Sequence, residues 1–261
     1  MGVISTMEEH KKPDNENEHS FHTIEAKPVE LEDNFDYFGQ KWFNRIRSSI
    51  LVFLVKIIIV GIYGRIFLGF RVINRAYFNE VKKKGHVVIS NHAHQFDAFL
   101  LGATFFPKKF HYTMLKTNMG LPIVGKLFYL LGGAPIPDKK DHLKTFQQQM
   151  NDVLSLNHMV AVFPEAALMP YHPKIRPFKK GAFRFAFNSK VDIIPMVFIF
   201  KKPTGLYKYL KKKPCVHLHV LKPYQVIELD TKYETLNYNT ERLQKIVSDY
   251  YDENSDYKGG N

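Results

Sequence analysis

Cysteine is nearly absent from this sequence. Cys215 is the only one among 261 residues, which excludes an internal disulfide framework. Stable disulfides belong to oxidising compartments, whereas cytosolic proteins keep their thiols reduced. The chain also does not open on a secretory signal, because its first apolar run begins near Ile50 rather than after a short basic start. We therefore expect an intracellular protein.

Acidic side chains are scarce beyond the first 36 residues. Residues 37–261 hold 34 Lys and Arg against 15 Asp and Glu, a net charge of +19. Such a field attracts nucleic acid, an acidic membrane surface, phosphorylated small molecules or an acidic carrier protein. The most basic run, Lys201–Lys213, interleaves its lysines with Tyr and Leu. Because no nucleic-acid motif accompanies this run, we expect a membrane or acidic carrier surface, or a solvated loop, and no nucleic-acid partner.

A long apolar run free of charges is also missing. The most hydrophobic stretch, Ser49–Phe70, is interrupted by Lys56 and Arg65, whereas a membrane-spanning helix needs about 20 apolar residues. Both basic side chains are long enough to reach water from helices lying in the membrane interface. We expect residues 36–78 to form membrane-associated helices on the cytoplasmic face, monotopic rather than transmembrane; a true span and a helix buried in the core are the alternatives.

The remainder of the chain alternates short β-rich runs with helical ones. This order predicts an α/β fold with a mostly parallel mixed sheet flanked by helices, over residues 79–252. Residues 1–35 lack an apolar period and are expected to be a disordered acidic tail, and residues 253–261 a flexible one. The expected strands are 86–90, 110–115, 133–137, 159–163, 193–200 and 216–221, and the expected helices are 95–104, 121–130, 142–156, 180–188 and 240–251.

Two histidines and an aspartate lie close together in the stretch ISNHAHQFDAF, after the first expected strand. One hypothesis is a metal-dependent hydrolase that uses His92 and His94. The binuclear pattern His-x-His-x-Asp-His fails, because Phe96 occupies the aspartate position and Asp97 is followed by Ala98. A zinc site needs three or four converging ligands, and no other histidine has a partner at ligand spacing. We therefore predict no metal.

The second hypothesis is proton transfer. A neutral imidazole at His92 is a general base at cellular pH, and a carboxylate at Asp97 fixes its tautomer and stabilises its cation. Asp97 is expected in the first turn of the next helix, where negative charge is favoured. The crevice beyond the carboxyl ends of parallel strands is where ligands bind. The competing interpretation is that Asn91 and Asp97 only cap a turn.

Four motifs in order resemble the glycerolipid acyltransferases, the 1-acylglycerol-3-phosphate acyltransferase family. They are Asn91-His92-x-x-x-x-Asp97, Gly132–Pro137, Val162–Glu165 and Ile193–Val197, within residues 79–225. The resemblance implies that His92 takes the proton of a lysophospholipid hydroxyl as it attacks an acyl thioester, and that Asp97 orients His92. It also implies phospholipid biosynthesis, with acyl-CoA or acyl carrier protein as co-substrate and no other cofactor. A non-catalytic basic membrane-binding module is the remaining alternative.

The resemblance and the basic residues suggest where substrate binds. Lys116 follows an expected strand where similar proteins have a lysine near the phosphate, and Glu165 is the glutamate of the third motif. Two departures put the acceptor head group in doubt: Pro137 stands where the family usually has an arginine, and Phe163–Leu168 lacks the usual glycine and arginine. Arg176, before a helix start, is expected to replace those cations. Lys116, Glu165 and Arg176 are therefore the predicted substrate-binding residues.

Overall fold

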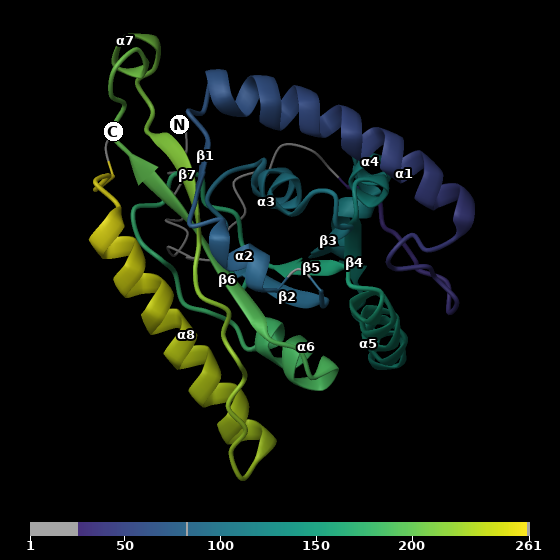
Figure 1. Ribbon diagram of the computed structural model, residues 1–261. Helices are drawn as coiled ribbons and strands as arrows, with labels where there is room; N and C mark the ends of the chain where they lie inside the picture. The colour runs from purple at the N-terminus through teal and green to yellow at the C-terminus, as the bar shows by residue number, and fades with distance from the viewer. Residues whose placement is uncertain (1–25, 82, 260–261) are drawn as a thin grey trace, which may run out of the picture.

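Seven strands form one sheet in the order β1-β7-β6-β2-β5-β3-β4 in the computed structural model, which describes residues 26–81 and 83–259 (Figure 1). Every neighbouring pair is parallel except β6 and β7. The expected mostly parallel mixed sheet is therefore confirmed. The strands are β1 (Arg71–Ile73), β2 (His86–Ser90), β3 (Phe110–Leu115), β4 (Gly133–Ile136), β5 (Met159–Val162), β6 (Ile193–Lys201) and β7 (Cys215–Val220).

The central strands are apolar along their whole length rather than alternating. All five residues of β2 and all four of β5 are buried, and only the last residue of β6 is not. A parallel sheet is covered on both faces, so continuous Val and Ile runs are typical of its strands. This is why the six expected strands lie within one or two residues of the observed ones.

Helices cover both faces of the sheet (Figure 1). α5, α6 and α8 contact β5, β2 and β6 and one another, while α3 and α4 contact β3 and β4 and the N-terminal helix. The helices are α1 (Trp42–Val55), α2 (Ala76–Glu80), α3 (Asp97–Phe105), α4 (Val124–Leu130), α5 (Lys140–Ser155), α6 (Gly181–Ser189), α7 (Tyr207–Leu210) and α8 (Lys232–Asn254), with a π-helical segment η1 (Lys56–Gly64) and a 3-10 segment η2 (Lys116–Gly120).

The N-terminal hydrophobic segment is one continuous helix, not the several shorter ones expected. α1 passes directly into η1, so Trp42–Gly64 runs for 23 residues and contains an 18-residue window with a mean hydropathy of 2.1. The break expected at Lys56 is wrong, because its long side chain leaves the helix and its ammonium lies 3.5 Å from the Phe106 ring centroid. None of the most apolar part is buried inside the protein, so the core-helix alternative is wrong too.

The expected boundary of the N-terminal tail falls inside a packed segment. Leu31 is buried, and Asp33 lies 2.9 Å from the Nε2 atom of His142 on α5. The acidic residues here have basic partners on the α/β domain, which the composition alone did not show. Residues 26–35 are therefore part of the folded protein, and the rest of the predicted tail, 1–25, lies outside the described residues.

Two further boundaries move for similar reasons. β1 pairs with β7, so the sheet begins at Arg71, inside the range expected to hold only membrane-associated helices. At the other end, the Ser255 hydroxyl donates to the Phe200 carbonyl at 3.2 Å, and the Asp256 carboxylate accepts from the Lys202 amide at 2.8 Å. Residues 255–256 are thus packed against β6 rather than part of a flexible tail.

Candidate active site

His92 and Asp97 face each other across the loop that joins β2 to α3, as the motif predicted. The Nδ1 atom of His92 lies 3.1 Å from Oδ2 of Asp97. The same oxygen accepts hydrogen bonds from the backbone amides of Ala93 at 2.7 Å and His94 at 2.9 Å. Because a carboxylate only accepts, the His92 proton sits on Nδ1. The Nε2 atom keeps its lone pair and is the atom that can take a proton from a substrate.

Asp97 and His92 differ in their exposure and in their place in the fold. Asp97 is fully buried and is the first residue of α3, where the helix dipole favours a negative charge. The His92 side chain is 24% exposed, so its ring is open on one side. The other side stacks on Phe163, with ring centroids 4.2 Å apart. Phe163 belongs to the third motif, but no local pattern indicates that it packs on the base.

Glu165 supports the His92 loop from β5. Its Oε2 atom accepts from the His92 backbone amide at 3.1 Å and from Nη2 of Arg176 at 2.8 Å. Its Oε1 atom accepts from the Arg176 backbone amide at 3.0 Å. Both side chains are buried, and the guanidinium also donates to the Ala167 carbonyl. Burial raises the pKa of Glu165, and the Arg176 guanidinium opposes that change.

These contacts bear on the substrate-binding role predicted for Glu165 and Arg176. Only 3% of the Glu165 side chain and 8% of the Arg176 side chain are exposed, and the charged atoms of each contact the other. The structure therefore places both residues next to His92. Glu165 contacts the backbone amide of His92 and Arg176 contacts Glu165, and neither side chain presents an open surface. Their binding of substrate stays a prediction, and their contacts favour a positioning role.

Lys116 lies at the same edge of the sheet, two strands away from His92. It follows β3, and its ammonium lies 2.6 Å from the Asp138 carboxylate that follows β4. With neighbouring strands about 4.8 Å apart, β2 and β3 are separated by about 10 Å. The hydrogen bond from Lys116 lowers the pKa of Asp138. Asp138 falls in the segment where the expected motif arginine is missing, and its pairing with Lys116 was not predicted.

Asn91, which the competing interpretation limited to capping a turn, bonds to the neighbouring strand. Its Oδ1 atom accepts from the Phe198 amide at 2.8 Å, and its Nδ2 atom donates to the Phe198 carbonyl at 3.1 Å. Both groups belong to the neighbouring strand β6. The amide therefore fixes the start of the His92 loop against the sheet, through a partner 107 residues away in sequence.

The metal hypothesis finds no support in the arrangement of ligands. Within residues 26–81 and 83–259, no three His, Cys, Asp or Glu side chains converge to hold an ion. The Nδ1 atom of His94 accepts from the Phe96 amide at 3.2 Å, whereas that of His92 is held by Asp97. The two rings of the His-x-His pair thus have separate partners.

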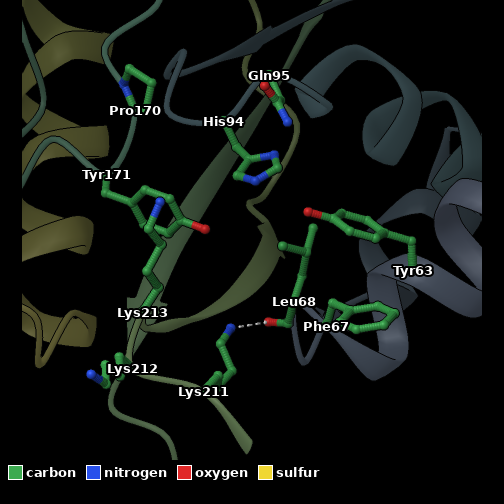
Figure 2. A pocket seen from close by; sticks show the side chains of 10 residues that line it. All are labelled: Tyr63, Phe67, Leu68, His94, Gln95, Pro170, Tyr171, Lys211, Lys212 and Lys213. Carbon is green, nitrogen blue, oxygen red and sulfur yellow. Dashed lines mark hydrogen bonds between the residues drawn. The ribbon is translucent and has the colours of Figure 1, made fainter.

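A pocket of about 430 Å³ opens beside the His92 loop (Figure 2). One wall comes from the end of the N-terminal helix and the residues after it, and another from the connection between α7 and β7. Sequence reasoning identified the basic run in that connection but not its position next to the loop. The lining residues are Tyr63, Phe67, Leu68, His94, Gln95, Pro170, Tyr171, Lys211, Lys212 and Lys213.

Comparison with known proteins supports the motif assignment. Residues 69–199, half of the chain, match the family model described as Acyltransferase. A 1-acyl-sn-glycerol-3-phosphate acyltransferase of Saccharomyces cerevisiae is 30% identical over 147 residues, covering 54% of this chain and 48% of the relative. The Caenorhabditis elegans protein acl-1, which is named for the same enzyme, is 32% identical over 134 residues. The match covers 50% of this chain and 49% of the relative. The chain thus spans about half the length of the curated relatives it matches.

Among solved structures, the 1-acyl-sn-glycerophosphate acyltransferase PlsC from Thermotoga maritima is similar to this chain. The TM-score is 0.49 with 17% sequence identity, over 84% of this chain and 100% of that one.

Proposed function

Because the chain belongs to the acyltransferase family, we propose that it moves a fatty acyl group from a thioester to the hydroxyl of a phosphorylated lysolipid. The observation that carries the proposal is the geometry of His92, whose Nδ1 lies 3.1 Å from the Asp97 carboxylate, which leaves Nε2 as the nitrogen that can accept a proton. The donor is acyl-CoA or an acyl carrier protein, and the reaction belongs to phospholipid biosynthesis. No cofactor beyond the thioester is needed.

The chemistry follows from the tautomer. Nε2 of His92 takes the proton of the acceptor hydroxyl as its oxygen attacks the thioester carbonyl carbon. The buried Asp97 carboxylate stabilises the imidazolium that forms. When the tetrahedral intermediate collapses, the C–S bond breaks, the proton passes from Nε2 to the leaving thiolate, and the ester C–O bond remains. Free thiol and acylated lipid leave, and His92 returns to its starting state.

The other residues of the site have supporting roles in this proposal. Glu165 and Arg176 hold the His92 backbone amide, and Phe163 holds the ring. We keep Lys116 as a cation for an anionic part of a substrate, with Asp138 as the carboxylate that such an anion must displace.

We propose a monotopic position at a membrane for the N-terminal helix. The helix is about 35 Å long at 1.5 Å per residue, which would suffice for a span. However, the segments on both of its sides pack on the same domain. Tyr37 is fully buried and its amide donates to Gln149 on α5 at 2.8 Å, and β1 joins the sheet soon after the helix ends. A span would separate these flanks across the bilayer, whereas an interfacial helix leaves both packed.

Incubation of the purified protein with radiolabelled acyl-CoA or acyl carrier protein and a panel of lysolipids tests the function. Formation of labelled diacyl lipid supports the proposal. Hydrolysis of lipid with no transfer, restored by added metal after chelation, would favour the hydrolase built on His92 and His94. Binding to anionic vesicles with neither reaction would favour the non-catalytic module.

A further inference from the structure

The pocket beside the His92 loop combines an apolar wall with a cationic one. Figure 2 shows Tyr63 and Phe67 on one side, and Lys211, Lys213 and Tyr171 on the other, with His94 above them. The apolar wall continues into exposed residues at the end of the N-terminal helix and just after it, since Ile62, Ile66 and Phe67 are more than half exposed. The shape and the two walls suit a molecule with an anionic head and a hydrocarbon tail.

Lys211 is fixed in place at this pocket. Its ammonium donates to the Leu68 carbonyl at 3.2 Å and to the Pro214 carbonyl at 2.7 Å, and the first of these bonds is drawn in Figure 2. An ammonium has three donor hydrogens, so one remains for a ligand. Burial lowers the pKa of Lys211. An anion in the pocket would favour the charged form of this ammonium.

Three neighbouring side chains add hydrogen-bond donors to the pocket. The Lys213 ammonium lies 5.2 Å from the ring centroid of Tyr171. Burial raises the pKa of Tyr171 to about 12, so its hydroxyl keeps its proton at neutral pH. Burial lowers the pKa of His94, so its ring is neutral. Because its Nδ1 accepts from the Phe96 amide, its proton is on Nε2, which is a donor.

The pocket carries no opposing charge. None of the ten described residues that line it is acidic. Lys116, in contrast, already has the Asp138 carboxylate at 2.6 Å. The pocket is therefore a concave site near the base. Its described lining residues include lysines and no carboxylate.

The position of the pocket suits a group attached to the reacting hydroxyl. His94 lines the pocket and lies two residues after His92, so their Cα atoms are at most about 7.6 Å apart. Both residues donate to the same Asp97 oxygen. On the far side, the Tyr171 amide donates to the Ala93 carbonyl at 2.9 Å. The loop that carries the base is therefore also the roof of the pocket.

We infer that this pocket binds the phosphate head group of the lipid acceptor, with Lys211 and Lys213 as its cations and the hydrocarbon chain along Phe67 and the N-terminal helix. The inference rests on the proposed function, because it identifies the phosphate of the same acceptor whose hydroxyl reaches His92. It places the acceptor head group on the side of His92 away from Lys116, at residues that the sequence motifs do not include.

Steady-state kinetics of the full chain in detergent micelles test this assignment. The variants are Lys213→Ala and the double variant Lys211→Ala/Lys213→Ala, and the matched control is Lys208→Ala, an exposed lysine on α7 outside the pocket. Hydrogen bonds to charged groups contribute about 1.5 to 3 kcal/mol, so the double variant should raise KM for lysophosphatidate roughly tenfold to hundredfold. KM for the acyl thioester and for monoacylglycerol, which lacks the phosphate, should stay within about twofold.

Other results would contradict the assignment, each in a different way. If KM for the thioester rises instead, the pocket holds a phosphate of the donor. If both acceptors are affected equally, or if Lys208→Ala has the same effect, the lysines act through the general field or the fold. Lys213→Ala, whose side chain is exposed, guards against misfolding: it should raise KM for lysophosphatidate severalfold by itself, and no change would overturn the assignment.

A binding measurement separates this inference from the proposed function. Equilibrium binding of short-chain lysophosphatidate and of short-chain monoacylglycerol needs no turnover. Wild type and Lys208→Ala should bind the phosphorylated lipid at least tenfold more tightly than the double variant, with no difference for monoacylglycerol. A protein that binds in this way yet transfers no acyl group would contradict the proposed function alone, whereas equal binding by all variants would contradict the pocket.

Discussion

The Nδ1 atom of His92 lies 3.1 Å from the Oδ2 atom of Asp97, and the same oxygen accepts hydrogen bonds from the backbone amides of Ala93 and His94. Three donors on one oxygen fix both the rotamer of Asp97 and the path of the loop. The Nδ1 proton of His92 is fixed with them, which leaves Nε2 as the basic atom. A spacing of five residues is what the loop requires, because His92 follows β2 closely and Asp97 begins α3.

Replacing Asp97 with Asn tests the role of its charge. The amide has the same shape but cannot stabilise an imidazolium as a carboxylate does, so turnover should fall about 10²- to 10⁴-fold. KM for the acceptor should change little, because Asp97 is buried and does not reach substrate. Single-turnover kinetics, with circular dichroism to confirm folding, provide the measurement. A folded Asp97→Asn protein with near wild-type turnover would show that the charge is not used.

Arg176→Met tests the buried pair with Glu165. Removing one partner of a buried ion pair leaves the other charge without compensation, so the free energy of unfolding should fall by about 3 to 5 kcal/mol. Urea unfolding gives the value. Lys245→Met is the matched control, because its pair with Asp249 is also 2.8 Å long but exposed, and exposed pairs contribute little to stability.

The kinetics of Arg176→Met distinguish the two roles considered for this residue. Acting through Glu165 and the His92 amide, it should lower turnover for acceptors with and without phosphate alike. A rise in KM confined to the phosphorylated acceptor would instead support the direct contact expected from the sequence.

Much of this arrangement could be predicted from local pattern. The strands of a buried parallel sheet are readable as apolar runs, and the His92 and Asp97 pair is readable because both residues belong to one loop. The pairing of Glu165 with the His92 amide joins residues 73 apart, and nothing in the local sequence identifies that partner. The same holds for Asn91 with Phe198, and for Lys116 with Asp138.

The N-terminal helix shows a different limit of the sequence. Lys56 and Arg65 were expected to divide the apolar stretch, because charge inside a membrane is costly. A helix on the surface of a domain does not pay that cost, since long basic side chains reach past its apolar face. Local composition described the segment correctly as hydrophobic and interrupted by charge, but it did not show that one helix runs through Lys56 and contacts α3 and α4.

Low pH should destabilise the fold through buried histidines. Burial lowers the pKa of His111 to about 3, while an unfolded chain titrates near 6.5. As pH falls, the unfolded state binds this proton first, so stability that is complete above pH 6.5 is lost between about pH 6.5 and 3. The slope approaches 1.4 kcal/mol per pH unit, at about pH 4 to 5. Urea midpoints across this range should fall, and His111→Gln should flatten the slope; an unchanged slope in that variant would contradict the assignment.

The topology of the N-terminal helix can be read by chemical labelling. With Cys215 replaced by alanine, single cysteines at Lys41 and Ile66, one exposed residue at each side of the helix, are placed in sealed vesicles. An interfacial helix predicts that an impermeant maleimide labels both from the same face, since both flanks pack on one domain. Labelling of the two cysteines from opposite faces would show that the helix spans.

The turnover of the His92→Ala variant shows whether His92 is the base for acyl transfer. With saturating thioester and lysophosphatidate, the folded variant should transfer the labelled acyl group about 10²- to 10⁴-fold more slowly than wild type, with acceptor binding retained. A folded His92→Ala protein that turns over within a few-fold of wild type would show that His92 is not the base.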